Sequence, residues 1–329
     1  MKNENWHKDE LLSRQGEIII PANFGKLETT LKKGKVYLVE QPDKNCDVFK
    51  KKEAFDNLLA EICYKVIAEE LGIPTVNIKP AVMIYSDGKN TNEGFLMENI
   101  IDNENQLEVP AHKILDKHIQ RTSDYHTIED NMLCLQLEKE RLLKNNKVKD
   151  VIVDKDIRNQ LLQIFFMDYI TVLTDRHDAN ITYIYELKDD CIYINLAKNY
   201  DNSFAFDFFT FFENYDIHTI EDQWKYVKDY TFFSFGIKNE ENNEDCLEFG
   251  FAGKQLAEEI KTNPFMKELY FKARALDFEK IKGKIQNELP QQKIPNKIFD
   301  YMQLVMGKML QSLEKNLTAN HYENIKEGM

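Results

Sequence analysis

The strongest pattern of hydrophobic and polar positions lies in the middle of the chain. Apolar residues recur at helical spacing through 156–174, which predicts a buried helix. Two runs of β-branched and aromatic residues follow, 181–185 and 191–196, and the polar turn between them predicts a β-hairpin. Such a hairpin would return the chain so that residues 200–202 lie beside Asn180.

The first hundred residues combine short extended runs with one long helical pattern. Three extended segments with glycine and proline between them predict an antiparallel sheet; they are 17–20, 27–31 and 35–40. Residues 54–71 have the pattern of an amphipathic helix, which Gly72 ends and Pro74 prevents from continuing. Residues 76–85 and 94–101 then predict a second hairpin.

The rest of the chain is helical in pattern. Helical periodicity runs through 110–149 and returns in 254–260, 264–276 and 297–313, whereas 314–329 is polar and is expected to fray. We therefore predict an α+β chain of two lobes. The N-lobe would be an antiparallel sheet plus one long helix over residues 1–101, and the mainly helical C-lobe would cover 102–329.

Composition and charge argue against several classes of function. The 329 residues are 43% hydrophobic, as in an ordinary globular protein, and carry a formal net charge of −13, which disfavours a nucleic-acid partner because phosphate binding needs clustered Lys and Arg. The sequence contains no run of about 18 apolar residues, the length that a membrane-spanning helix requires, so we expect a cytoplasmic protein. The five cysteines are dispersed without a CxxC pair, which predicts free thiols.

Three polar residues around the central hairpin indicate a chemistry. Within the loop Leu-Thr-Asp-Arg-His-Asp-Ala-Asn, Asp175 precedes Asn180 by five residues, and Asp201 follows Asp175 by 26 in the sequence Tyr-Asp-Asn. Protein kinases space their catalytic Asp and a Mg²⁺-binding Asn in this way, and take a second Mg²⁺ ligand from an Asp further along. We therefore predict a kinase-like fold that uses ATP, with Asp175 as base and Asn180 and Asp201 as Mg²⁺ ligands. The alternative is a set of acidic loops on an acidic surface.

The segments TDRHDAN and NYDNSFAF resemble the loop and the following segment of the HipA-like kinases, and Asp168 occupies a position that is often Asp in that family. Lipid kinases and the spore-coat CotH kinases share the DRHxxN loop, but the flanking segments favour the HipA-like family. The resemblance implies a Ser/Thr kinase that transfers the ATP γ-phosphate to a protein substrate, with a possible partner or antitoxin protein.

The resemblance also implies contacts for the nucleotide in the N-lobe. Glu61 precedes Leu-Gly-Ile-Pro as the helix Glu of the family does, although a solvent-facing Glu is the alternative. The backbone of Glu98 and Ile100 would meet the adenine edge, since 94–101 resembles the strand that enters a kinase hinge. Lys26 lies where the family has a phosphate loop.

One position departs from the family. Where HipA-like kinases carry a phosphate-binding lysine in the sequence aliphatic-Lys-x-Pro, this chain has Leu-Val-Glu-Gln-Pro, with Glu40 at the lysine position. A carboxylate there would repel the triphosphate. Lys44 or Lys26 would then supply the missing cation. The alternatives are a pseudokinase or nucleotide-binding scaffold, and a kinase of small molecules or lipids.

Overall fold

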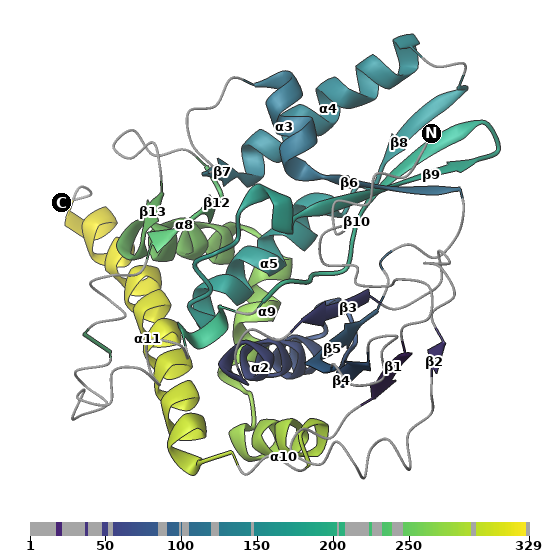
Figure 1. Cartoon of the computed structure of the whole chain (residues 1–329). Helices are drawn as coiled ribbons and strands as arrows, with labels where there is room; N and C mark the ends of the chain where they lie inside the picture. The colour runs from purple at the N-terminus through teal and green to yellow at the C-terminus, as the bar shows by residue number, and fades with distance from the viewer. Residues whose placement is uncertain are drawn as a thin grey trace.

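The computed structural model (Figure 1) describes most of the chain from residue 55 onward and three strands before it. The described residues are 18–21, 37–38, 48–51, 55–84, 91–98, 100, 105–119, 125–145, 148–202, 204–207, 224–225, 232–238, 246–290 and 294–326. Lys26, Glu40 and Lys44 lie outside these ranges, and so does the predicted strand 27–31.

Among the described residues, the N-terminal sheet has five antiparallel strands in the order β2-β1-β4-β5-β3. They are β1 (Ile18–Pro21), β2 (Tyr37–Leu38), β3 (Val48–Lys51), β4 (Ile78–Ile84) and β5 (Thr91–Met97). The predicted strand 17–20 and the predicted hairpin of 76–85 with 94–101 are confirmed. The sequence pattern did not indicate β3, which is short, contains two lysines and is defined by its pairing with the distant β5.

A second sheet contains the predicted central hairpin. Its order is β6-β9-β10-β8, with β10 and β8 parallel and the other pairs antiparallel. The strands are β6 (Gln106–Pro110), β8 (Asp150–Val153), β9 (Thr182–Lys188) and β10 (Cys191–Leu196). The hairpin is thus confirmed, and the outer strands β6 and β8 give it partners on both sides.

The prediction that 110–149 is helical is confirmed for most of its described residues, but a short strand interrupts it. Two helices form there, α3 (Ala111–His118) and α4 (Ile128–Asn145), with the short strand β7 (His126–Thr127) before the second. Strand β7 pairs in parallel with β12 (Phe235–Gly236), more than a hundred residues away. Local periodicity cannot show a break whose cause is so distant a partner.

The central helix α5 (Ile157–Thr171) delivers the chain to the predicted catalytic loop. Every residue from Leu161 to Thr171 is buried, and the helix ends at Val172 with φ +54°. A β-branched residue in the left-handed region is strained, so the surrounding packing must hold this sharp exit. The backbone N–H of Leu173 caps the helix by donating to the carbonyl of Asp168 (2.8 Å).

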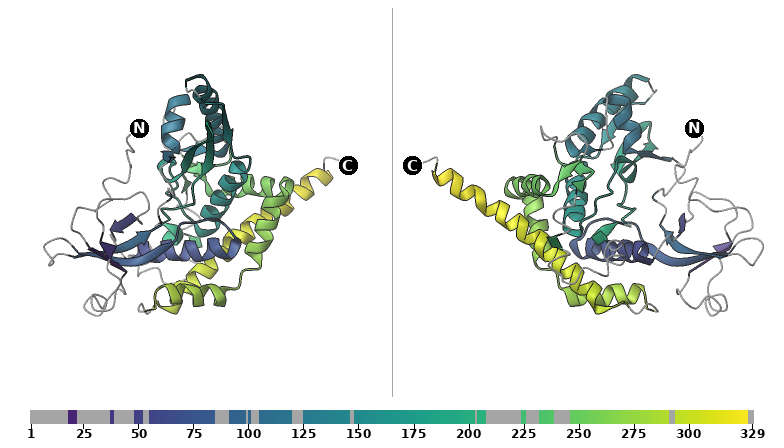
Figure 2. Two further views of the ribbon diagram at one scale, coloured as in Figure 1. Left: turned by 90° about the vertical axis from the view of Figure 1, so that its right-hand side faces the viewer. Right: turned by 60° about the vertical axis from the view of Figure 1, so that its left-hand side comes forward.

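Four helices and two further short strands, β11 (Phe232–Phe233) and β13 (Leu247–Glu248), complete the described chain. The helices are α8 (Phe249–Thr262), α9 (Pro264–Arg274), α10 (Phe278–Glu288) and α11 (Asn296–Lys326). The predictions for α8, α9 and α11 are confirmed, whereas α10 was missed. Helix α11 continues to Lys326, past the predicted helix end at residue 313. Figure 2 shows α11 running along one side of the helical part, with α10 beside the N-terminal end of α11.

Helix α2 (Phe55–Leu71) corrects the prediction of an amphipathic helix. It ends as predicted, with Gly72 at φ +75°, but residues 58–68 are all buried. The helix contacts β4 of the first sheet and also α5, α9, α10 and the short 3-10 helix η3 (Ala205–Asp207). A helix covered on every side lies inside a domain core; α2 is therefore a central element in contact with both parts of the molecule.

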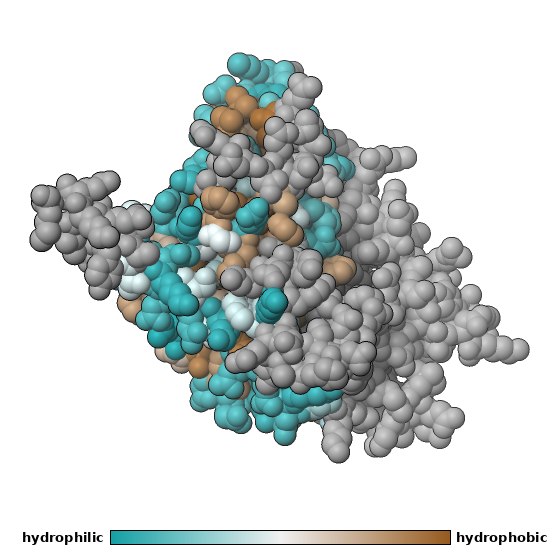
Figure 3. Space-filling model, turned by 90° about the vertical axis from the view of Figure 1, so that its left-hand side faces the viewer, coloured by the Kyte–Doolittle hydropathy of each residue, from teal (hydrophilic) through white to brown (hydrophobic). Residues whose placement is uncertain are grey.

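The surface of the described residues is mainly polar. Figure 3 shows hydrophilic residues interrupted by separate apolar areas on one face. The most exposed large apolar side chains include Leu133, Leu187 and Phe271, which belong to different elements. None of the described helices combines the length and the apolar character that a crossing of a lipid bilayer requires.

Candidate active site

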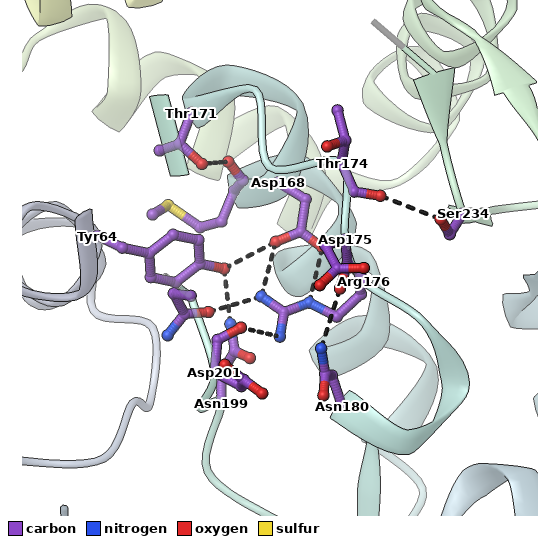
Figure 4. A network of polar contacts seen from close by, with 12 residues as sticks. Tyr64, Asp168, Thr171, Thr174, Asp175, Arg176, Asn180, Asn199, Asp201 and Ser234 are labelled. Atoms are coloured by element: carbon purple, nitrogen blue, oxygen red, sulfur yellow. Dashed lines mark hydrogen bonds and ion pairs between the residues drawn. The ribbon is translucent and has the colours of Figure 1, made fainter. Parts of the chain in front are cut away.

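The predicted catalytic loop is organised by the buried guanidinium of Arg176. Its Nε and Nη2 donate to the two carboxylate oxygens of Asp168, each at 3.0 Å, and both side chains are 1% exposed. Burial disfavours the charged form of Arg176, but Asp168 outweighs that effect, and the pKa of Arg176 lies above its ordinary value. This two-pronged ion pair fixes Arg176, and hence its neighbour Asp175, against helix α5 (Figure 4).

The same guanidinium holds the segment of Asp201. Arg176 Nη1 donates to the carbonyl oxygen of Tyr200 (2.8 Å), and Nη2 donates to Oδ1 of Asn202 (2.6 Å). Asp201 lies between these anchors with φ +56°, a left-handed conformation that Asp tolerates better than most residues. One side chain of the loop therefore determines where Asp201 stands relative to Asp175, as the hairpin prediction required.

Asn180 has a buried oxygen available for a cation. It ends the 3-10 helix η2 (Asp178–Asn180), is 3% exposed, and its Nδ2 donates to the carbonyl oxygen of Asp175 (2.9 Å). This bond orients the amide, and Oδ1 has no hydrogen-bond partner among the residues that the structure describes. A buried acceptor is costly to leave unpaired, and a hard oxygen of this kind is what Mg²⁺ takes as a ligand. The residue thus fits the metal role predicted for it.

Asp175 and Asp201 are both half-buried, in contrast to the buried Arg176 and Asn180. Figure 4 shows Asn180 and Asp201 on either side of the guanidinium, with Asp175 beside it. Within the described ranges, no three His, Cys, Asp or Glu side chains are grouped closely enough to hold a metal ion. Mg²⁺ in nucleotide sites takes one or two carboxylates and completes its shell with phosphate oxygens and water. Asn180 and Asp201 fit that arrangement as the protein's share of the ligands.

A second set of bonds fastens the segment of Asp201 to η2. The hydroxyl of Tyr200 lies 2.6 Å from Oγ1 of Thr182 and donates to the carbonyl oxygen of Ala179 (3.1 Å). Tyr200 and Thr182 are buried. Because Ala179 precedes Asn180, these bonds connect the two predicted metal ligands through the backbone.

Glu61 is buried in α2 and reaches the same segment. Its Oε1 accepts a hydrogen bond from the backbone N–H of Asn202 (2.8 Å), and the residue is 1% exposed. The solvent-facing alternative is therefore wrong. Glu61 contacts the residue next to Asp201, a contact that the sequence did not reveal; its nucleotide role stays a prediction.

Glu98 follows β5 and connects the predicted hinge with the segment that leads to Asp201. Its N–H donates to the carbonyl of Asn77 (2.8 Å), which leaves the carbonyl as the backbone group of Glu98 that could meet a nucleotide. Its carboxylate lies 2.6 Å from the ammonium of Lys198. Asn199 in turn pairs with the backbone of Pro74 and Val76. Ile100 packs, partly buried, against the core, and the adenine contact of both residues stays a prediction.

The departure at Glu40 lies outside the described residues and stays a prediction, but the first sheet shows which described strand comes before the Glu-bearing helix. Kinases place the phosphate-binding lysine on the strand that precedes the Glu-bearing helix. That strand is β3, which contains Lys50 and Lys51 and pairs with β5, whereas β2 lies at the opposite edge of the sheet. Lys50 and Lys51 are therefore closer to α2 in the sequence than Glu40 is. The roles predicted for Lys26 and Lys44 fall outside the described residues and stay predictions.

The sequence predicted Asp175, Asn180 and Asp201 as site residues, and the structure brings them together. The sequence analysis assigned no role in the site to Tyr64, Asn199 and Asn202, and it included Arg176 only as part of the loop motif. A signal was available, because Asp168 is the one charged residue between Leu161 and Thr171 in a buried helix, and such a carboxylate requires a cationic partner.

Comparisons with known proteins identify the fold. No protein-family model matches the chain, and no curated protein matches its sequence. The crystal structure of the proinflammatory kinase CtkA of Helicobacter pylori aligns with a TM-score of 0.54 and 10% identity, over 84% of this chain and 92% of that one. HipA in its complex with HipB and operator DNA, a toxin–antitoxin system of Shewanella oneidensis MR-1, aligns with a TM-score of 0.46 and 13% identity, over 95% of this chain and 66% of that one. The chain therefore has the two-lobed α+β fold of a kinase, as its resemblance to the HipA-like kinases implied.

Proposed function

We propose that the protein is an ATP- and Mg²⁺-dependent kinase that transfers the γ-phosphoryl group to a Ser or Thr hydroxyl of a protein substrate. The observation that carries this proposal is the buried oxygen of Asn180, which has no partner in the described part of the chain. The bond of Asn180 to Asp175 orients this oxygen, and Arg176, the neighbour of Asp175, reaches the backbone of Tyr200 and Asp201. This arrangement contains the oxygen ligands for Mg²⁺ and the carboxylate base that phosphoryl transfer requires, with the spacing of a kinase loop.

The roles follow from burial and chemistry. Asp175 is half-buried, so its carboxylate can meet a substrate hydroxyl, orient it and accept its proton. Asn180 Oδ1 and the Asp201 carboxylate would hold Mg²⁺. The bound metal and nucleotide would supply the phosphoryl group and neutralise charge on its oxygens. Arg176 is buried and bonded to Asp168, Tyr200 and Asn202, so its role would be to hold Asp175 and Asp201 in place.

A pseudokinase or nucleotide-binding scaffold is the first alternative. It depends on Glu40 at the position of the family's phosphate-binding lysine, and Glu40 lies outside the described residues. Strand β3, which leads into α2, contains Lys50 and Lys51. Transfer to a lipid or a small molecule remains the second chemical alternative, and the choice of acceptor in the experiment addresses it.

The decisive experiment compares purified variants in transfer from radiolabelled ATP to a Ser/Thr peptide library, with lipid and sugar acceptors in parallel. We expect Asp175→Asn to keep ATP affinity near that of the wild type and to lower transfer by about 10²-fold or more, the scale of general-base catalysis. Asn180→Ala and Asp201→Ala should weaken Mg²⁺-dependent nucleotide binding, measured by calorimetry, without unfolding the protein.

A matched control is Asp189→Asn, the same change at an exposed position in the β9–β10 turn, where φ is +53° and Asn is tolerated. It should leave transfer and binding unchanged. Unaltered nucleotide binding and turnover in both Asn180→Ala and Asp201→Ala would remove the kinase proposal.

A further inference from the structure

Tyr64 is a buried polar residue for which the proposed chemistry has no use. It lies in α2, is 0% exposed, and is flanked by the fully buried Ile62, Cys63 and Ile67. A phenylalanine would fill the same space in so apolar a helix. The hydroxyl group therefore calls for an explanation other than packing.

We propose that Tyr64 is a positioning residue that sets the catalytic loop and the metal-binding segment from helix α2. Its hydroxyl donates to Oδ1 of Asp168 (3.1 Å) and accepts a hydrogen bond from Nδ2 of Asn199 (2.6 Å). The ring lies 6.0 Å from the guanidinium carbon of Arg176. A single hydroxyl thus joins α2, α5 and the segment before Asp201. The kinetic consequence rests on the proposed function; the positioning role does not.

One arm of this connection leads to Asp175. Asp168 receives Tyr64 Oη on the same oxygen that accepts from Arg176 Nη2. The position of the carboxylate determines the position of the guanidinium, and Arg176 is the residue next to Asp175. Loss of the hydroxyl would leave Asp168 with Arg176 as its donor and more freedom to rotate within the pocket.

The other arm leads to Asp201. Asn199 lies two residues before Asp201, and its backbone is already held on the N-lobe side by Pro74 and Val76. Tyr64 of α2 fixes its side chain through the bond to Nδ2. The Tyr64 hydroxyl therefore fixes the chain at Asn199, just before Asp201. Arg176 fixes it at Tyr200 and Asn202, on either side of Asp201.

Two further features suit a permanent role. Burial raises the pKa of Tyr64 well above its ordinary value, and the Asp168 charge adds to this, so the hydroxyl keeps its proton and donates throughout the working range of pH. Helix α2 is also braced from outside. Lys65 pairs with Glu288 of α10 (2.8 Å), and Glu70 pairs with Lys280 of the same helix (2.7 Å). These ion pairs to α10 hold α2, and with it the Tyr64 hydroxyl, in position.

The test compares Tyr64→Phe with Tyr183→Phe as a matched control. Tyr183 is 1% exposed, and its hydroxyl also donates to one buried side chain, Oδ1 of Asn131 on α4 (2.7 Å). Both variants lose one oxygen from a buried ring. Backbone hydrogen exchange is measured over 175–180 and 199–202, and Mn²⁺ binding is measured by electron paramagnetic resonance with a non-hydrolysable ATP analogue.

Tyr64→Phe removes two hydrogen bonds, one to Asp168 and one from Asn199. We expect it to speed exchange in both segments by roughly tenfold and to weaken Mn²⁺ binding by a similar factor, the scale of one to two lost hydrogen bonds. Tyr183→Phe should stay within about twofold of the wild type in both measurements, since it removes a bond of the same kind elsewhere. A second variant, Asn199→Ala, keeps the Tyr64–Asp168 bond and should speed exchange over 199–202 only.

Equal exchange and equal Mn²⁺ affinity in the two Tyr→Phe variants would overturn the proposal, as would an effect of Asn199→Ala on both segments. A wild-type protein that binds no Mn²⁺-nucleotide, combined with faster exchange in Tyr64→Phe alone, would refute the proposed function and leave the positioning role standing.

Discussion

Two buried carboxylate–arginine pairs in this molecule differ in what they connect. In the site, the side chains of Asp168 and Arg176 are both 1% exposed. Between α3 and α4, the side chain of Glu138 is 4% exposed, but that of its partner Arg141 is 34% exposed. The first pair takes both charges out of water, whereas the second leaves the cation half in it.

The pair at the contact of α3 with α4 is local, because both of its residues belong to α4. Arg141 stands three residues after Glu138 on one helix and binds it in two places, at 2.6 and 2.7 Å. His118 of α3 adds a contact at 2.8 Å. Burial opposes ionisation of Glu138, but hydrogen bonds from Arg141 and His118 outweigh it and lower its pKa to about 2. This cluster joins two helices and stabilises them.

The pair in the site connects elements that are distant in sequence. Besides Asp168 on α5, Arg176 contacts Tyr200 and Asn202 beyond the hairpin. Fully buried ion pairs contribute little net stability, because desolvation of both ions offsets their attraction. We infer that the pair in the site mainly sets the geometry of the loop, and that the pair around Glu138 mainly stabilises the contact of α3 with α4.

The largest expected effect sharpens this comparison. Arg176→Met leaves the carboxylate of Asp168 buried and without its cation, and should lower the free energy of unfolding by roughly 3–5 kcal/mol. Arg141→Met should cost about 1 kcal/mol, because Glu138 keeps His118 and Lys117. Urea unfolding of both variants beside the wild type measures the two losses. Losses of equal size would show that the two pairs have the same energetic character.

The site could be predicted from the sequence only where its geometry is local. Asp175 and Asn180 stand five residues apart in one loop, so spacing alone identified them. The partners of Arg176 lie 8 to 26 residues away along the chain, and Tyr64 is 104 residues from Asp168. Which of many polar residues meet across such separations depends on tertiary packing, which no local pattern contains.

The fold shows the same division. Long segments with strong patterns, such as α2, α5 and the β9–β10 hairpin, could be predicted to within a few residues. Strand β3 has four residues and β7 has two, and both exist because a distant strand pairs with them. The burial of α2 on all sides was also hidden, because its charged residues Glu61 and Lys65 gave it a polar face that other elements cover.

A smaller change in the free energy of unfolding is expected at low pH, from the pair of Glu138 with Arg141. The pKa of Glu138 is about 2 in the folded protein, against an ordinary value of 4.5. A lowered pKa contributes stability that is complete above the ordinary value and is lost as the pH falls through 4.5 towards 2. The wild type should therefore lose on the order of 2 kcal/mol in this window that Glu138→Gln does not lose. Unfolding of both proteins at about pH 5 and about pH 2.5 gives the difference; parallel losses would contradict the assignment.

The smallest effect is expected at the rim of the same cluster. Lys117 lies 3.4 Å from Glu138 and its side chain is 42% exposed, so water and salt screen most of its attraction. Lys117→Met should change the free energy of unfolding by at most about 0.5 kcal/mol, and this difference should vanish in about 1 M salt. The control is Arg141→Met in the same two salt concentrations, whose loss should persist because Arg141 makes two short hydrogen bonds to the buried carboxylate of Glu138. If Lys117→Met destabilised the protein as much as Arg141→Met, proximity to a buried carboxylate would matter more than burial of the cation. The contrast with Asp168 and Arg176 would then need a different explanation.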